Sequence, residues 1–329
     1  MTRPLLVIVG PTCTGKTWLA VAVAKHLGSA ELLSADSRQL RRGLRVGTCA
    51  PSADELDGVR CHLLELADPG APFSVADWID AAGRVLLDIE ERGVVAIVVG
   101  GTGLYVTALI DGFDFGGAAP DPERRAARAA LAATPHGLEQ LASQLYEQDP
   151  AGAAAVDVRN PRRVLRALEI LDARGGSLID ARRADPQPAV IIGLDVEPET
   201  HARWLRTRVG GMFDSGALIE EAGSALRSGV PVKALAASGI GYAEAIDVIQ
   251  GRRDREAAAA STLRRTTQYA KAQRTYFRRD KRIHWLRPDK LTPEELLLTT
   301  LRLAREGGAA PAEGAAITGQ PLTPTAAAH

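Results

Sequence analysis

Residues 5–17 read LLVIVGPTCTGKT, and the fold class can be inferred from this segment near the N-terminus. The apolar run Leu5–Val9 predicts a buried parallel strand, which ends at Gly10-Pro11. From about Lys16 onward, apolar residues recur at helical spacing, so a strand, a glycine-rich loop and a helix follow one another. In that context the pattern G-x-x-x-x-G-K-[ST] indicates a phosphate-binding loop rather than an ordinary turn.

Each residue type in this loop suits a phosphate group. Gly10 and Gly15 let successive backbone N–H groups point inward, and the helix that begins near Lys16 adds the positive end of its dipole. Lys16 supplies a charge for terminal phosphate oxygens, and the Thr17 hydroxyl suits Mg²⁺. A diphosphate, a triphosphate such as that of ATP, and a pyrophosphate all remain open as ligands of Gly10, Pro11, Thr12, Cys13, Thr14, Gly15, Lys16 and Thr17.

Composition limits the class of protein. The 329 residues are 46% hydrophobic and 24% charged, which is typical of soluble globular proteins. The formal net charge is zero, so affinity for a nucleic acid requires a local basic surface. The 3 cysteines lack paired spacing, which argues against a disulfide framework or a zinc site. Without a secretory pattern or an apolar stretch of membrane length, we expect a cytoplasmic enzyme with no membrane contact.

Two more predicted strands carry polar residues to one edge of a parallel sheet. The strand at 30–34 leads into the loop 36–39, DSRQ, which places Asp36 near the phosphate loop. There an acid can bind metal or accept a proton, although a helix cap is an alternative role for it. The strand at 94–99 ends in GGTGLY at 100–105, where glycines permit close approach of a ligand and Thr102 can donate a hydrogen bond.

The middle of the chain changes character. Between 115 and 188 strands disappear and alanine, arginine and leucine dominate, which predicts an all-helical insertion. A strand at 189–196 completes the sheet, and the basic segment 263–281 has interleaved aromatics that suit RNA. We therefore expect an α/β fold, with a P-loop NTPase-like parallel sheet flanked by helices. The first part of the core occupies residues 1–114, and the helical insertion occupies residues 115–188. The rest of the core, with the basic C-terminal helices, occupies residues 189–304, and a disordered tail follows at 305–329.

Taken together, these motifs resemble the tRNA dimethylallyltransferase family, prenyltransferases that modify the adenine 3′ of the anticodon. The resemblance covers residues 5–287 and includes the phosphate loop and GGTGLY at 100–105. Its other blocks are SADSRQ at 34–39, GT at 47–48, HL at 62–63, SVAD at 74–77, RVLRALE at 163–169, GIGY at 239–242 and QYAKAQ at 268–273. The combination is far more specific than the phosphate loop alone.

The resemblance implies a mechanism. Dimethylallyl diphosphate is the donor, with its diphosphate held by the phosphate loop, Mg²⁺ at Thr17, and Arg208. The catalytic residues are Lys16, Asp36, which takes a proton from the exocyclic amine, and Thr102, which binds a diphosphate oxygen. The acceptor is the anticodon stem-loop of tRNAs that read codons beginning with U, bound by a monomeric enzyme through Asp36, Ser37, Arg38, Gln39, Thr102, Arg125, Arg162, Arg163 and Arg166.

The chain departs from the family pattern around the rim of the expected site. It has Arg41, Arg45, Ala50, Cys61 and Tyr276 where the family usually has Tyr, Asp, Lys, His and Trp. The phosphate loop, Asp36 and Thr102 are intact, so the departures bear mainly on substrate detail.

Two other enzyme classes share part of this pattern. A small-molecule kinase has the loop, the sheet and an arginine-rich lid, and a prenyltransferase acting on free adenine nucleotides has the same chemistry. The long insertion and the basic helix favour a large RNA acceptor instead. A non-enzymatic RNA-binding module would not need Lys16, Thr17 and Asp36 together.

Overall fold

The computed structural model describes residues 3–113, 121–174, 176–178 and 186–312. The chain divides into two compact units, which we call the core unit (1–106 with 187–329) and the helical unit (107–186). Segments 114–120, 175 and 179–185 of the expected insertion lie outside the described residues, as does 313–329 of the expected tail.

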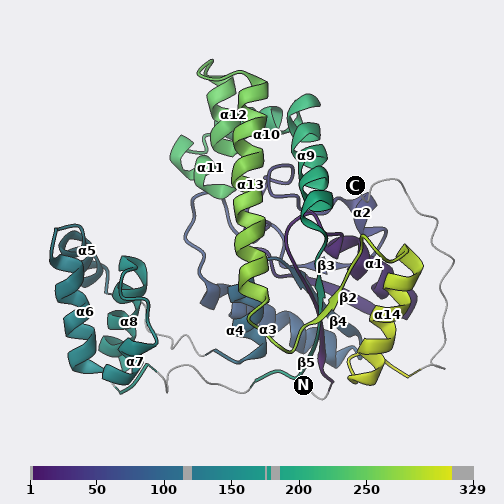
Figure 1. Cartoon of the computed structure of the whole chain (residues 1–329), viewed down its shortest axis with the longest axis horizontal. Helices are drawn as coiled ribbons and strands as arrows, with labels where there is room; N and C mark the ends of the chain where they lie inside the picture. The colour runs from purple at the N-terminus through teal and green to yellow at the C-terminus, as the bar shows by residue number, and fades with distance from the viewer. Residues whose placement is uncertain (1–2, 114–120, 175, 179–185, 313–329) are drawn as a thin grey trace. The chain divides into compact units, whose positions relative to one another are not determined.

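A parallel sheet forms the centre of the core unit, as predicted (Figure 1). Its strand order is β3-β2-β4-β1-β5-β6, and every neighbouring pair is parallel. The strands are β1 (Leu5–Val9), β2 (Ala30–Ser34), β3 (Cys61–His62), β4 (Val95–Gly100), β5 (Ala189–Leu194) and β6 (His284–Leu286). The short edge strands β3 and β6 were not predicted, because two or three residues show no periodicity.

Strand β1 occupies an interior position that explains its composition. It pairs with β4 through Leu6 and Ile97 and with β5 through Ile8 and Ile192. All five of its residues are buried, since helices cover both faces of a parallel sheet. Each fully buried aliphatic side chain contributes about 1.5–3 kcal/mol relative to exposure, so this strand is rigid support for the loop that follows it.

Helices of the core unit flank this sheet or extend beyond its carboxyl edge. They are α1 (Lys16–Leu27), α2 (Ala53–Leu56), α3 (Val75–Glu91), α4 (Gly103–Ile110, which continues into the helical unit), α9 (Pro198–Asp214), α10 (Ala217–Arg227), α11 (Val232–Ser238), α12 (Tyr242–Ile249), α13 (Arg255–Phe277) and α14 (Pro293–Glu306). Helix α3 begins at a capping box formed by Ser74 and Asp77. Its buried Trp78 stacks on Tyr105 at 4.7 Å, which holds α3 against the start of α4.

A second hydrophobic cluster joins the helices α9 to α13; Figure 1 shows α10, α11 and α12 above the sheet and the long α13 running down from them. Its buried members include Leu44, Phe213, Leu218 and Tyr242. Because Leu44 belongs to the chain between β2 and β3, this cluster ties the helices to a loop at the carboxyl edge of the sheet. That loop therefore has a fixed position beside the strand ends.

The packed chain extends farther than the expected tail boundary at residue 305. Helix α14 ends at Glu306, and Ala309 and Ala310 are buried in the same cluster as the strands. The small alanine side chains fit against the sheet, although their composition resembles that of a disordered segment. The prediction of a tail beginning at 305 was therefore too early.

The helical unit contains α5 (Pro122–Ala132), α6 (Gly137–Gln148), α7 (Pro150–Ala154) and α8 (Pro161–Arg174). Leu141, Leu145, Val164 and Leu168 form its buried core. Asp149 caps α7 by accepting a hydrogen bond from Gly152 N, and it also accepts one from Leu178 N. Throughout the described residues, the helices are too short or too polar to cross a membrane.

Candidate active site

The phosphate loop has the backbone geometry that its glycines predict. Gly10 has a φ of 144°, and a Cβ there would lie 2.3 Å from the backbone oxygen of Leu194. Gly15 caps α1 in the left-handed region with a φ of 82°. Cys13 also has a positive φ, 63°, which is unusual for a residue other than glycine. Left-handed residues within such a loop turn backbone N–H groups toward a common centre, where an anion binds.

Two side chains of the phosphate loop form hydrogen bonds with the backbone of the loop itself. Lys16 Nζ donates a hydrogen bond to the Pro11 carbonyl oxygen at 2.6 Å, and Thr14 Oγ1 donates to the same oxygen at 2.9 Å. Burial lowers the pKa of Lys16 to about 8, while the nearby Asp36 carboxylate opposes that shift. Lys16 is thus charged at neutral pH, and a bound diphosphate would compensate its burial.

Asp36 lies just beyond β2, at the same edge of the sheet. Its Oδ1 accepts a hydrogen bond from Arg38 N at 2.9 Å. Burial raises the pKa of Asp36 despite that hydrogen bond and the charge of Lys16. The raised pKa makes this carboxylate a better proton acceptor than an exposed aspartate. The hydrogen bond is a local turn contact, so Asp36 does not cap a helix.

Thr102 follows β4 and joins the loop after β2. Its Oγ1 accepts a hydrogen bond from Ser37 N at 2.9 Å and donates one to Ser37 Oγ at 3.2 Å. Arg38 Nη1 donates to the Ala237 carbonyl oxygen at 2.9 Å. The turns after β2 and β4 therefore form one polar surface beside Asp36.

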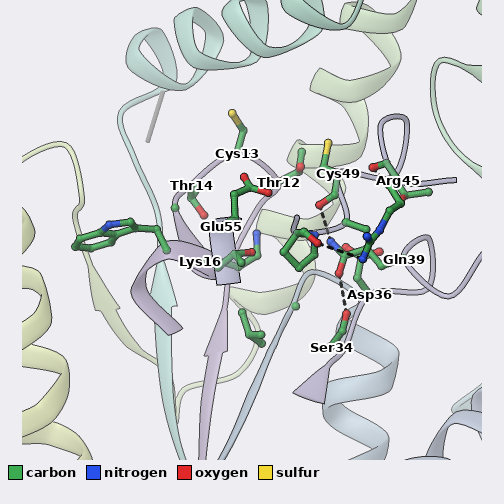
Figure 2. A pocket seen from close by; sticks show the side chains of 18 of the residues that line it. Thr12, Cys13, Thr14, Lys16, Ser34, Asp36, Gln39, Arg45, Cys49 and Glu55 are labelled. Atoms are coloured by element: carbon green, nitrogen blue, oxygen red, sulfur yellow. Dashed lines mark hydrogen bonds between the residues drawn. The ribbon is translucent and has the colours of Figure 1, made fainter. Parts of the chain in front are cut away.

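A cavity of about 330 Å³ opens between the phosphate loop and the loop after β2 (Figure 2). Of the predicted site residues, it is lined by Thr12, Cys13, Thr14, Gly15, Lys16, Thr17, Asp36, Gln39 and Arg208. Gly10, Pro11, Ser37, Arg38 and Thr102 are not among the described residues that line the cavity. The cavity thus brings together the positively charged side chains of Lys16 and Arg208, the Asp36 carboxyl group and the backbone of the phosphate loop.

Several residues that line the cavity were not predicted as site residues. They are Trp18, Leu32, Ser34, Arg45, Val46, Thr48, Cys49, Ala50, Pro51, Glu55, Cys61, Val99, Gly100, Trp204 and Met212. Seven of these fifteen residues belong to the chain between β2 and β3, which is irregular apart from the short α2, so no periodic pattern exists to place them. Their mixture of apolar and polar side chains suits a ligand with a charged end and a hydrocarbon end.

Hydrogen bonds to Glu221 hold the irregular segment in place. The carboxylate of Glu221 accepts hydrogen bonds from three successive backbone N–H groups, those of Arg45, Val46 and Gly47, at 2.6–3.1 Å. Tyr242 donates its hydroxyl to Glu221 Oε1 at 2.7 Å. The cavity wall is therefore anchored to α10 and α12.

Helix α13 reaches the phosphate loop through Gln273. Its Oε1 accepts a hydrogen bond from Thr12 N at 2.8 Å, and its Nε2 donates to the Gly101 carbonyl oxygen at 2.9 Å. The block QYAKAQ at 268–273 was the signal for this residue, yet its basic neighbours suggested RNA contacts alone.

Four predicted tRNA contacts lie in the helical unit. Arg125 and Arg166 form ion pairs with the buried carboxylate of Glu169, at 3.4 Å and 3.3 Å. Arg163 pairs with Asp157 at 3.6 Å, and Arg162 is exposed at the start of α8. The structure thus places these arginines on α5 and α8 of the same small helical unit.

The donor set allows a test of the expected Mg²⁺ ion. The cavity holds the Thr17 side chain and the carboxylates of Asp36 and Glu55, all oxygen donors of the kind that Mg²⁺ prefers. Within the part of the chain that the structure describes, no group of three or more His, Cys, Asp or Glu side chains could hold a metal ion. The residues fit an ion that takes most of its ligands from substrate and water.

The fold and the cavity define a P-loop protein with an acid opposite its phosphate-binding loop. The model of the IPP transferase family matches residues 39–280, and that of the isopentenyl transferase family matches residues 4–67. The chain belongs to the IPP transferase family. Membership confirms the resemblance and the prediction of a transferase, and it favours neither the kinase nor the RNA-binding module.

Curated relatives and solved structures agree with this assignment. The chain is 37% identical to the tRNA dimethylallyltransferase of Pelotomaculum thermopropionicum over 310 residues, or 93% of this chain and 97% of the relative. It resembles the crystal structure of the tRNA isopentenylpyrophosphate transferase of Bacillus halodurans with a TM-score of 0.68 and 35% identity, over 93% and 97% of the two chains. A eukaryotic dimethylallyltransferase structure shares the fold, with a TM-score of 0.75 at 21% identity over 92% and 78%.

Proposed function

We propose that this protein transfers the dimethylallyl group of dimethylallyl diphosphate to the exocyclic amine of the adenine 3′ of the anticodon, releasing diphosphate. The acceptors are tRNAs that read codons beginning with U. The observation that carries the proposal is the single cavity in which Lys16 and the phosphate loop face Asp36. The names of the relatives support both the donor group and the tRNA acceptor.

The residues divide the reaction between them. The lone pair of the amine forms the new N–C bond, and the electrons of the allylic C–O bond leave with the diphosphate. Asp36 takes the proton that the amine loses, and its raised pKa suits that role. Lys16, Arg208 and the loop N–H groups stabilise the charge that develops on the leaving diphosphate. Thr102, whose hydroxyl contacts Ser37 beside Asp36, would bind a diphosphate oxygen once the substrate is seated.

Mg²⁺ fits beside Thr17, where it would neutralise part of the charge on the diphosphate oxygens. The apolar lining, which includes Leu32, Val99 and Met212, suits the dimethylallyl group and excludes water from the reacting carbon. We propose that the enzyme acts as a monomer. Its tRNA substrate implies a cytoplasmic location.

The RNA is bound outside the cavity. We propose that Ser37, Arg38 and Gln39 bind it next to Asp36, while Arg125, Arg162, Arg163 and Arg166 of the helical unit bind the stem-loop. The target base leaves the loop stack to reach Asp36, as enzymes acting on bases require. The helical unit of 107–186 is the tRNA-binding part of this proposal.

The test is transfer from labelled dimethylallyl diphosphate, with Mg²⁺, to an anticodon stem-loop that carries adenines 3′ of the anticodon. We expect labelled RNA, and Asp36→Asn should lose about 10²–10⁴-fold in rate while binding RNA and diphosphate normally. Asp57→Asn, an exposed carboxylate paired with Lys25, is the matched control. Labelling of free AMP or ATP instead of the RNA, or ATP consumption with a small acceptor, would contradict the proposal.

A further inference from the structure

A buried histidine of α9 binds the backbone of the phosphate loop. His201 is 3% exposed, and its Nε2 lies 2.8 Å from the Thr12 carbonyl oxygen. A carbonyl oxygen can only accept a hydrogen bond, so Nε2 carries the ring proton and donates the hydrogen bond to Thr12. The histidine is thus part of the loop's support, although no feature of the sequence pointed to it.

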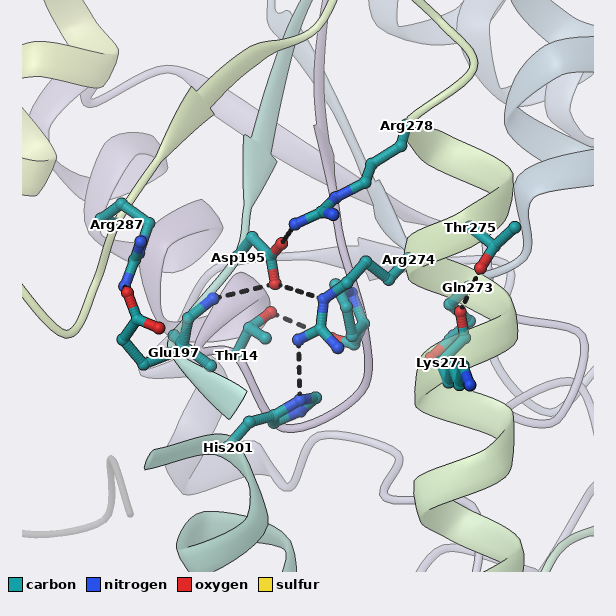
Figure 3. Close-up of polar contacts among 12 residues, drawn as sticks. Thr14, Asp195, Glu197, His201, Lys271, Gln273, Arg274, Thr275, Arg278 and Arg287 are labelled. Atoms are coloured by element: carbon teal, nitrogen blue, oxygen red, sulfur yellow. Dashed lines mark hydrogen bonds and ion pairs between the residues drawn. The ribbon is translucent and has the colours of Figure 1, made fainter. Parts of the chain in front are cut away.

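A chain of polar contacts fixes the ring of His201 in this state (Figure 3). Arg274 Nη2 donates to His201 Nδ1 at 3.1 Å, so Nδ1 is an acceptor and the imidazole is neutral. Arg274 Nε in turn donates to Asp195 Oδ1 at 2.7 Å. Asp195 also accepts from Val196 N at 2.9 Å and from Arg278 Nη2 at 3.0 Å.

The charged groups that face His201 agree with a neutral ring. Burial is the largest cause that lowers the pKa of His201, and the charges of Arg274 and Lys16 lower it further. The hydrogen bond to Thr12 and the charge of Asp195 raise the pKa, but the net shift is downward. Protonation at Nδ1 would remove the acceptor for Arg274. The network therefore selects one tautomer and one ring orientation.

The contact has a direct consequence for the anion site. The described residues contain no cis peptide bond, so the N–H of Cys13 points away from the Thr12 carbonyl and thus away from His201. Thr12 N is already held by Gln273. Both polar groups of the Thr12 backbone are therefore held, the carbonyl by α9 and the N–H by α13, and the N–H of Cys13 is the next one along the loop.

The backbone at Cys13 needs such a clamp. Its φ of 63° is disfavoured for a side chain with a Cβ, so the surroundings must hold it there. We propose that His201 is a positioning residue for the diphosphate: through Thr12, it holds the Cys13 N–H in the orientation that binds a diphosphate oxygen. The inference rests on the proposed function of the same cavity, whose ligand is a diphosphate.

The test compares three variants of the full-length protein for binding of inorganic pyrophosphate with Mg²⁺, by titration calorimetry. We expect His201→Leu to weaken binding at least about tenfold, which is the effect of losing one hydrogen bond to a charged ligand. His201→Gln, whose amide can still donate to Thr12, should recover most of the affinity. His136→Leu is the control, because His136 is an exposed histidine of the helical unit that pairs with Glu139.

Two further measurements separate positioning from general damage. In transfer assays, His201→Leu should raise KM for dimethylallyl diphosphate and leave KM for the RNA unchanged. Because the chain has 3 cysteines, ¹⁵N-cysteine labelling gives few amide signals, and Cys13→Ala identifies that of Cys13. Its signal should move on pyrophosphate addition in the wild type and much less in His201→Leu.

The outcomes are distinguishable. If the wild type binds no pyrophosphate, the proposed function fails. If the wild type binds it and His201→Leu binds it equally well, the positioning role is overturned. Equal loss in His201→Leu and His201→Gln would assign the effect to packing of the ring, which also overturns the inference.

Discussion

Gln273 accepts a hydrogen bond from the backbone N–H of Thr12 at 2.8 Å, although the two residues are 261 positions apart in the chain. Its amide nitrogen donates to the Gly101 carbonyl at 2.9 Å. One buried amide from α13 thus links the loop after β1 to the turn after β4. The geometry of the cavity therefore depends on this helix.

Replacing Gln273 with Leu should destabilise the protein by about 2–4 kcal/mol, because Thr12 N–H and the Gly101 carbonyl lose their buried partner. Gln273→Glu should cost less, since a carboxylate oxygen still accepts from Thr12. Urea unfolding measures both effects. Gln268→Leu, an exposed position on the same helix, should change stability by less than about 0.5 kcal/mol. Equal stability of Gln273→Leu and the wild type would contradict the link.

The affinity for diphosphate should depend on pH through Lys16. Its pKa is about 8 because it is buried, so the charge that binds phosphate is present at pH 7 and is lost as the pH rises above 8. The affinity ratio of wild type to Lys16→Gln should therefore shrink between pH 7 and pH 9. Calorimetric titration with pyrophosphate gives the ratio directly, and the comparison cancels the titration of pyrophosphate itself. A constant ratio over this range would refute the prediction.

Gly47 should tolerate no side chain. A Cβ there would lie 2.5 Å from Tyr242 Cζ, and the buried ring has no room to retreat. Gly47→Ala should cost about 1–3 kcal/mol of stability and also weaken diphosphate binding, because it displaces the cavity wall. Gly83→Ala makes the same change in α3, where no atom lies within 4 Å of the new Cβ. That control should stabilise the protein by about 0.5–1 kcal/mol, as thermal unfolding can show.

Glu31 should contribute to stability in a pH-dependent way. Hydrogen bonds from Arg92 and His62 lower its pKa from 4.5 to about 2, against the effect of burial. Since the folded-state pKa lies below the unfolded value, the contribution is complete above about pH 4.5 and is lost as the pH falls toward 2. Glu31→Gln should therefore lose about 2 kcal/mol at pH 7. The difference from wild type should narrow in urea unfolding at pH 3, and a gap that widens there would contradict this account.

The arginines at the start of α8 should affect RNA binding alone. Arg162→Ala with Arg163→Ala should lower the slope of log affinity against log salt by about 1–2, because each phosphate contact releases counterions. Pyrophosphate binding should remain unchanged. The paired control, Arg227→Ala with Arg302→Ala, removes two exposed arginines of the core unit. If both pairs change the slope equally, the effect is one of net charge, and α8 is not a specific RNA contact.

Local patterns in the sequence were sufficient for the framework of this protein. The run at 5–17 predicted β1, the phosphate loop and α1, and the placement of Asp36 and Thr102 followed because parallel strands bring their carboxyl ends to one edge. These features depend on periodicity and turn chemistry within a few residues, which a single sequence displays directly.

The tertiary structure alone decided which distant side chains support the site. Gln273 and His201 meet Thr12 only because α13 and α9 pack with particular faces toward the loop. Glu221 likewise reaches the irregular segment at 45–47 from a helix more than 170 positions away. Such contacts are set by how helices rotate and pack on the sheet, and that information is spread over many hydrophobic residues rather than written at either end of a hydrogen bond.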